Sequence, residues 1–209
     1  MTAMPMFPLG SPLYPGAALA LHVFEPRYRE LVRDCLAADV PEFGVVMIER
    51  GSEVGGGDQR STWGTVARMV QVGALPDGRY SVVAVGGRRL KVSTWLPDDP
   101  YPHADVEDWP EDGGDAADED RLIAAVSARV RRALALSVEL GDLTEVPEMS
   151  VSADPVSASY RLGALAPIGP ADRHKLLGAP GPRARLEMLE GVLDDVEALL
   201  RFRLGGAAP

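Results

Sequence analysis

Hydrophobic and polar residues alternate through most of the first half of the chain, in short runs separated by glycine and proline. This period of two predicts strands rather than helices. One interruption begins at Pro26, where apolar residues recur every three or four positions, as expected of one amphipathic helix. The alternating runs predict six or seven strands, at 4–9, 17–24, 43–48, 62–72, 79–85, 90–96 and 101–109.

The second half of the chain follows a helical period instead. Ile123, Val126, Val130 and Leu134 lie on one helical face. Asp154 before Pro155 is a typical helix start, with the aspartate as N-cap and the proline in the first turn. These patterns predict a small bundle of helices at about 119–140, 155–166, 170–178 and 182–204.

Charge divides the chain into segments. The formal net charge is −10, and eleven of the 31 acidic residues lie between Asp98 and Asp120, a stretch without lysine or arginine. Residues 110–120 are rich in proline, glycine and acids. Such a segment buries too little apolar surface to offset the loss of chain entropy on ordering, so this stretch is predicted to be a linker. We therefore expect a β-rich domain at 1–109, an acidic linker at 110–120 and a helical subdomain at 121–209.

Four motifs together resemble a known family. They are His22–Arg29, Gly64–Val72, Asp77–Tyr80 and Gly86–Val92, and they resemble the N-terminal substrate-binding domain of Lon proteases over nearly the whole chain. The resemblance implies an α+β fold, in which a PUA-like pseudo-barrel with one inserted helix precedes an α-helical bundle. It further implies a stand-alone, non-catalytic module that binds polypeptide substrates for proteolysis.

Sequence motifs of catalysis are missing. The chain has no Gly-x-x-x-x-Gly-Lys-Ser/Thr phosphate loop, so no ATPase is expected. Lon peptidases use a serine activated by a lysine, and neither Lys91 nor Lys175 lies in that family context. His22, His103 and His174 are not spaced as zinc ligands. We accordingly predict no enzyme activity, no catalytic residue, no metal and no cofactor.

Candidate binding residues come from the strands, because a site for unfolded segments requires exposed aromatic or methionine side chains, or a free sheet edge. For each such residue taken singly, a place in the core or half-burial is favoured over a ligand contact. The predicted substrate-binding residues are Tyr14, Trp63, Met69, Tyr80 and Trp95. Those of the family signature, Phe24, Glu25, Pro26, Arg27 and Tyr28, lie at a strand-to-helix junction and are expected to be structural.

The expected partners are unfolded or hydrophobic polypeptide segments, and a protease or chaperone remains open as a further partner. The chain has no apolar run long enough for a membrane span. It has one cysteine, Cys35, and so no internal disulfide, and both features favour a cytoplasmic location. A small-molecule-sensing or RNA-binding regulator is the alternative, the latter resting on Arg88, Arg89 and Lys91. The acidic charge disfavours nucleic acid. A homodimer through the last helix also stays open.

Overall fold

The computed structural model describes residues 2–51, 53, 57–113 and 116–206. Its contacts divide the chain after Pro110 into two units, which we call the sheet unit (residues 1–110) and the helical unit (residues 111–209). The elements confirm the predicted α+β class, a β-rich pseudo-barrel with one inserted helix followed by a helical bundle.

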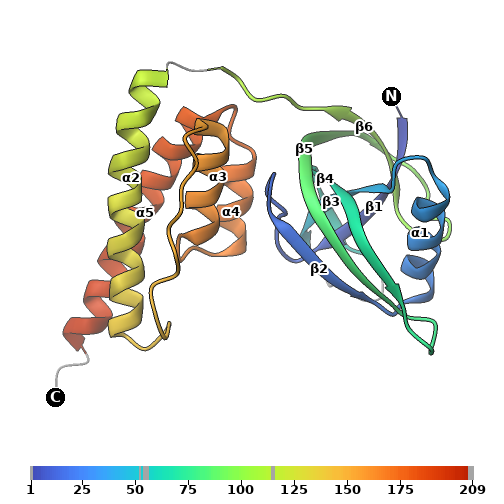
Figure 1. The fold of residues 1–209 in the computed structure, drawn as a ribbon, viewed down its shortest axis with the longest axis horizontal. Coiled ribbons are helices and arrows are strands. Elements are labelled where there is room, and N and C mark those ends of the chain that lie inside the picture. Colours follow the sequence, from blue (N-terminus) through green and yellow to red (C-terminus); the bar gives the residue numbers. More distant parts are fainter. Residues whose placement is uncertain (1, 52, 54–56, 114–115, 207–209) are drawn as a thin grey trace. The chain divides into compact units, whose positions relative to one another are not determined.

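The sheet unit is a six-stranded mixed sheet in the order β2-β5-β4-β3-β1-β6 (Figure 1). A further pairing of β5 with β6 closes it into a barrel. Only β1 and β3 run parallel among the described pairs, and the others are antiparallel. The elements are β1 (Thr2–Leu9), β2 (Ala18–Val23), α1 (Pro26–Ala37), β3 (Glu42–Arg50), β4 (Gln59–Ala74), β5 (Tyr80–Trp95) and β6 (His103–Asp108).

One sequence prediction is wrong in the barrel. The two strands expected at 79–85 and 90–96 are a single strand, β5, whose first part pairs with β2 and whose second part pairs with β6. Gly86 lies between the two parts, and a Cβ at this position would lie 2.2 Å from the Tyr14 carbonyl oxygen. Glycine therefore permits a close backbone approach within a continuous strand rather than ending it.

The core of the sheet unit lies between the barrel and α1. This helix begins at Pro26, as predicted, and buries Tyr28, Leu31, Val32 and Cys35. The ring of Tyr28 stacks on Phe7 of β1 with centroids 4.1 Å apart. One apolar stripe on α1 thus covers the interior of the sheet, as its helical period indicated.

The helical unit consists of α2 (Ala116–Glu139), α3 (Pro155–Leu165), α4 (Pro170–Leu177) and α5 (Pro182–Gly206) (Figure 1). The Asp154 side chain accepts a hydrogen bond of 2.9 Å from the Ser157 amide, which confirms the predicted N-cap. The predicted linker differs from the structure. Residues 116–120 form the start of α2, where Asp118 and Glu119 favour helix because acids stabilise a first turn. Residues 114–115 of that segment lie outside the described part.

A buried arginine stands at the centre of the helical unit. Arg185 of α5 is fully buried, and its Nε donates to the Leu176 carbonyl at 3.0 Å. Its terminal nitrogens donate to Ser159 Oγ, the Tyr160 hydroxyl and Glu111 Oε2, each at 2.8 Å. The guanidinium carbon lies 3.6 Å from the centroid of the Tyr160 ring. One side chain therefore joins α3, α4, α5 and the first residue of the unit.

Candidate functional site

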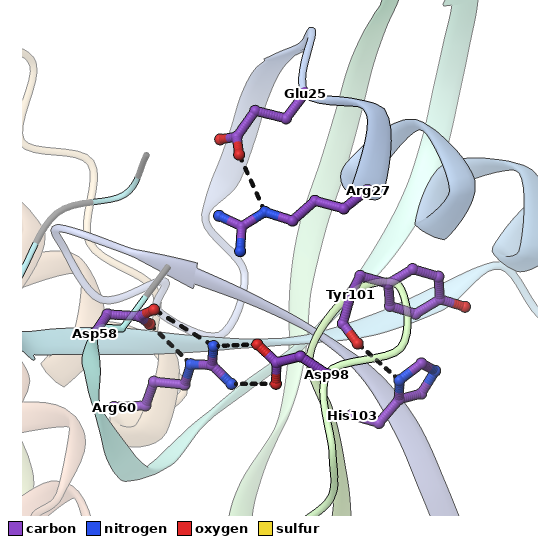
Figure 2. A network of polar contacts seen from close by, with 7 residues as sticks. All are labelled: Glu25, Arg27, Asp58, Arg60, Asp98, Tyr101 and His103. Carbon is purple, nitrogen blue, oxygen red and sulfur yellow. Dashed lines mark hydrogen bonds and ion pairs between the residues drawn. The ribbon is translucent and has the colours of Figure 1, made fainter. Parts of the chain in front are cut away.

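The signature segment, residues 24–28, forms the junction between β2 and α1. Glu25 is the N-cap residue in extended conformation, and its carboxylate accepts a hydrogen bond of 3.0 Å from Arg27 Nε instead of capping the helix (Figure 2). Burial raises the pKa of Tyr28 to about 12, so its hydroxyl stays protonated. Phe24, in contrast, is 55% exposed. A structural role for the five signature residues therefore stays a prediction, which the burial of Tyr28 supports and the exposure of Phe24 does not.

An arginine held by two carboxylates lies at the start of β4 (Figure 2). Arg60 donates from Nη1 and Nη2 to Asp98 at 2.9 and 2.7 Å, and from Nε to Asp58 at 2.8 Å. Burial alone would raise the pKa of the Asp58 carboxyl, but the hydrogen bonds and charge of Arg60 hold that pKa below its usual value. Because both carboxylates accept from the guanidinium, this network joins two segments and is no site for an added anion.

Tyr101, three residues after Asp98, also holds its segment in place. The hydroxyl of Tyr101 donates to Asp34 Oδ2 at 2.7 Å, and burial together with that bond raises the pKa of Tyr101. His103 stacks on the Tyr101 ring, and its Nδ1 lies 2.9 Å from the Tyr101 carbonyl oxygen (Figure 2). These contacts fix the chain between β5 and β6 against α1.

The structure does not gather the five predicted substrate-binding residues into one cleft. Tyr14 and Met69 are buried, whereas Trp63, Tyr80 and Trp95 are half-buried. Met69 and Tyr80 pack in the cluster beneath α1, and Trp95 packs against a second cluster. For the two buried residues a core role accounts for the position. Binding by the other three stays a prediction.

The basic residues of β5 are largely engaged. Arg88 donates to Asp108 Oδ1 at 2.7 Å and to Glu42 Oε2 at 2.9 Å. Arg89 is buried, with its guanidinium carbon 4.4 Å from the centroid of Trp109, and Lys91 Nζ lies 4.2 Å from the same centroid. Such an arrangement leaves little unpaired positive charge to contact a phosphate backbone.

An apolar groove that the sequence prediction missed lies in the helical unit. Its volume is about 400 Å³, and its walls come from the end of α2, the following loop, the end of α3, Arg173 of α4, and α5. Leu199 and Leu143 line it while 59% and 36% exposed. The apolar lining residues are Leu134, Leu143, Pro147, Ala164, Leu165, Ala166, Pro167, Val196, Leu199 and Leu200.

The charged residues of the groove bind groups of the protein itself. Arg203 pairs with both oxygens of Asp142, at 2.6 and 3.0 Å. Arg173 Nη2 donates to the carbonyl oxygens of Ala164 and Ala166. The groove therefore offers aliphatic surface between polar groups that already have partners. One sequence signal could have found it, since Leu199 lies off the apolar stripe that buries the rest of α5.

The described residues contain neither a metal-binding cluster nor a membrane-spanning helix. No group of three histidine, cysteine, aspartate or glutamate side chains there is arranged to hold a metal ion. No described helix combines the length and apolarity needed to cross a bilayer.

Comparison with known proteins gives consistent matches. The model of the family described as the ATP-dependent protease La (LON) substrate-binding domain matches residues 3–195. Lon protease 2 of Sorangium cellulosum is 29% identical over 96% of this chain, which spans only 26% of that relative. The Lon protease of Anaeromyxobacter dehalogenans is 34% identical over 50% of this chain and 12% of its own length.

A solved structure covers both units. The crystal structure of a Lon N-terminal domain protein from Xanthomonas campestris is 28% identical, has a TM-score of 0.66, and covers 91% of this chain and 98% of its own. The family match extends from β1 into α5 and thus includes the pseudo-barrel, the signature segment and the grooved bundle. The chain belongs to the Lon substrate-binding domain family.

Proposed function

We propose that this chain is a non-catalytic, ATP-independent module that binds exposed apolar segments of unfolded polypeptides. The observation that carries the proposal is the apolar groove of the helical unit, with Leu143 and Leu199 exposed at its wall. Apolar side chains that remain in water in a folded protein mark a surface on which another apolar group gains by burial.

The lining of the groove, and not its size, favours a peptide segment over a metabolite. A volume of about 400 Å³ accommodates a few side chains. Small-molecule sites orient their ligand with a few free polar groups. Here Arg173 and Arg203 are engaged by carbonyl oxygens and by Asp142. Aliphatic walls without free polar groups select for hydrophobicity and not for one chemical structure, which suits a binder of many unfolded chains.

The proposed place of the module in proteolysis rests on its relatives. The two relatives described above are Lon proteases, of which this chain spans about a quarter or less. Because the chain carries no phosphate loop or peptidase motif, degradation of a bound polypeptide would require a protease supplied elsewhere. We infer that capture is this chain's contribution and that cleavage is not.

The proposal is tested by fluorescence anisotropy with a labelled, permanently unfolded protein as the probe. The Leu199→Asp variant places a charge in the groove wall and should weaken binding about tenfold or more, a loss of about 1.4 kcal/mol. Met188→Asp is the matched control, since Met188 is also partly exposed on α5 but does not line the groove. Absence of binding by the parent, or equal loss in both variants, contradicts the proposal.

A further inference from the structure

Strand β2 is the one strand of the barrel that has a single partner strand among the described residues. Strands β1, β3, β4 and β6 each have two partner strands, although residues 71–74 of β4 pair only with β5. Strand β5 pairs with β4, and in turn with β2 and β6. Strand β2, in contrast, pairs only with β5, through residues 18–23. Its outer edge is therefore free along the whole strand, and the sheet can be extended there.

The backbone groups at this edge can be assigned. In an antiparallel pair, alternate residues direct their amide and carbonyl groups to the partner and the others direct them away. The Gly86 amide donates to the Ala17 carbonyl at 2.9 Å. Continuing the alternation, Ala18, Ala20 and His22 direct their backbone groups outward. All three residues are exposed, and no hydrogen bond to their backbone occurs outside the ladder within the described residues.

Within residues 18–23 the edge lacks the features by which proteins prevent strand addition, although Gly16 and Ala17, just before this stretch, both bond to Gly86. Free edges are normally protected by charged residues, proline or β-bulges. The sequence Ala-Leu-Ala-Leu-His-Val of β2 contains no lysine, acid or proline. The β2–β5 register is also regular, whereas the β3–β4, β4–β5 and β5–β6 pairs each contain a shift. An open and unprotected edge indicates that β2 pairs with a further strand as part of the protein's function.

We propose that the outer edge of β2 binds an extended segment of another polypeptide as an added strand. The area argues against a second copy as the occupant. Six paired residues present an edge about 20 Å long and about 10 Å high, or roughly 200 Å². A stable protein pair covers about 800 Å² on each partner. A short extended segment that binds reversibly fits this edge, whereas a dimer would need further surface.

The side chains of β2 define which segment fits. Leu19 and Leu21 are half-buried against the core cluster, so an added strand places every second residue beside apolar surface on that face. Ala18 and Ala20 on the opposite face are small and leave room for bulky neighbours. Because β2 has no charged residue, the expected segment is also uncharged. Apolar residues alternate in it with uncharged residues of any type.

The proposal concerns a different surface from the apolar groove and does not depend on it. Its probe is a fluorescein-labelled octapeptide of alternating valine and threonine, compared with the same peptide carrying N-methyl groups along one edge. Strand addition uses backbone amides, so N-methylation should weaken binding about tenfold or more. Equal binding of the two peptides, or no binding of the unmodified one, overturns the proposal.

Two variants of one residue test the edge from the protein's side. Ala20→Pro removes an outward amide but no bond to β5, and should abolish binding of the octapeptide. Ala20→Val keeps the amide, adds comparable bulk and should bind within about twofold of the parent. Tryptophan fluorescence in denaturant checks that both variants fold, and the N-methyl comparison remains decisive if Ala20→Pro does not.

One cross-test separates the two surfaces. Leu199→Asp should leave octapeptide binding unchanged, since Leu199 lies in the helical unit. Loss of octapeptide binding in that variant would place the peptide in the groove and overturn strand addition. Sedimentation of the parent protein provides a further check, because a dimer that Ala20→Pro dissociates would assign the edge to a second copy.

Discussion

The two units of this protein are stabilised in different ways. In the sheet unit the fully buried polar side chains are few, Ser61, Thr65 and Arg89 among the described residues, and glycine permits close contact between strands. The helical unit instead organises three of its segments around the guanidinium of Arg185. The sheet unit should therefore be sensitive to added bulk, and the helical unit to changes of charge and pH.

The same contrast extends to binding. The sheet unit offers backbone groups along β2, which recognise extended conformation whatever the sequence. The helical unit offers aliphatic side chains around a groove, which recognise hydrophobicity. An unfolded polypeptide is both extended and rich in exposed apolar residues, so the two surfaces suit the same class of partner.

The units can be followed separately in one sample. The three tryptophans, Trp63, Trp95 and Trp109, all belong to the sheet unit, so tryptophan fluorescence reports its unfolding. Helices α2 to α5 belong to the helical unit, so circular dichroism at the helix band reports mainly on that unit. Each prediction below therefore names the signal in which the change should appear.

The largest effect is expected from Arg185→Met. The substitution leaves the Glu111 carboxylate and the Ser159 hydroxyl without their guanidinium, and breaking a buried pair costs about 3–5 kcal/mol. Denaturant unfolding should shift in the helix signal more than in the tryptophan signal. Arg183→Ala, which removes a half-exposed ion pair on the same helix, should cost less than about 1 kcal/mol. Equal shifts in the two variants would show that the buried network does not stabilise the unit.

Gly64→Ala tests the sensitivity of the sheet unit to bulk. An added Cβ would lie 1.9 Å from the Val45 carbonyl oxygen of β3, so the strands must separate at a cost of about 3 kcal/mol. The loss should appear in the tryptophan signal. Gly73→Ala on the same strand has its nearest atom at 4.0 Å and should be neutral. If Gly64→Ala left the unfolding free energy unchanged, close contact between the strands would not explain the sensitivity of the sheet unit to added bulk.

His174 makes the helical unit sensitive to pH. Burial lowers the pKa of His174 from 6.5 to about 4, so the folded state holds the ring neutral. Its contribution to stability is complete above pH 6.5 and is lost as the pH falls toward 4, because the unfolded chain takes up the proton first. The unfolding free energy in the helix signal should fall by on the order of 2 kcal/mol more in the parent than in His174→Gln over this range. The same pH dependence of the unfolding free energy in parent and variant would show that His174 is not the source of the acid sensitivity.

The smallest effect is expected at Arg60. Arg60→Ala removes the hydrogen bonds to Asp58 and Asp98 at the partly exposed end of β4 and should cost about 1–2 kcal/mol in the tryptophan signal. Because the pKa of Asp58 is lowered, its contribution is present at neutral pH and is lost as the pH falls through that lowered pKa. The difference between parent and variant should therefore diminish in strong acid. A difference that persists there would exclude the ion pair as its source.

Local sequence rules predicted the elements whose boundaries have a local cause. Pro26 starts α1 and Asp154 caps α3, because proline and aspartate act on the adjacent turn. The prediction of two strands instead of β5 failed, since Gly86 also marks many turns and its close approach to Tyr14 depends on residues far away in the sequence. Composition predicts a linker for the acidic segment, because it does not show that Asp118 and Glu119 lie in a first helical turn.

The candidate sites were harder to predict than the fold. Residue type selected Tyr14 and Trp63 equally, yet one is buried and the other half-buried, since burial depends on packing partners. The groove combines residues of four helices and a loop, so a local pattern such as the position of Leu199 indicates an exposed leucine but not the groove around it. The free edge of β2 follows from strand order alone, and its sequence carried no sign beyond the absence of charge and proline.

The most direct test of polypeptide binding is a titration of the isotope-labelled protein with a permanently unfolded protein, followed residue by residue in its amide NMR spectrum. We predict saturable shifts at 134–147, 164–167 and 196–203, the segments around the groove. Further shifts are expected at 18–22 on the free edge. A spectrum that does not change, or one that changes only at other residues, would contradict the account.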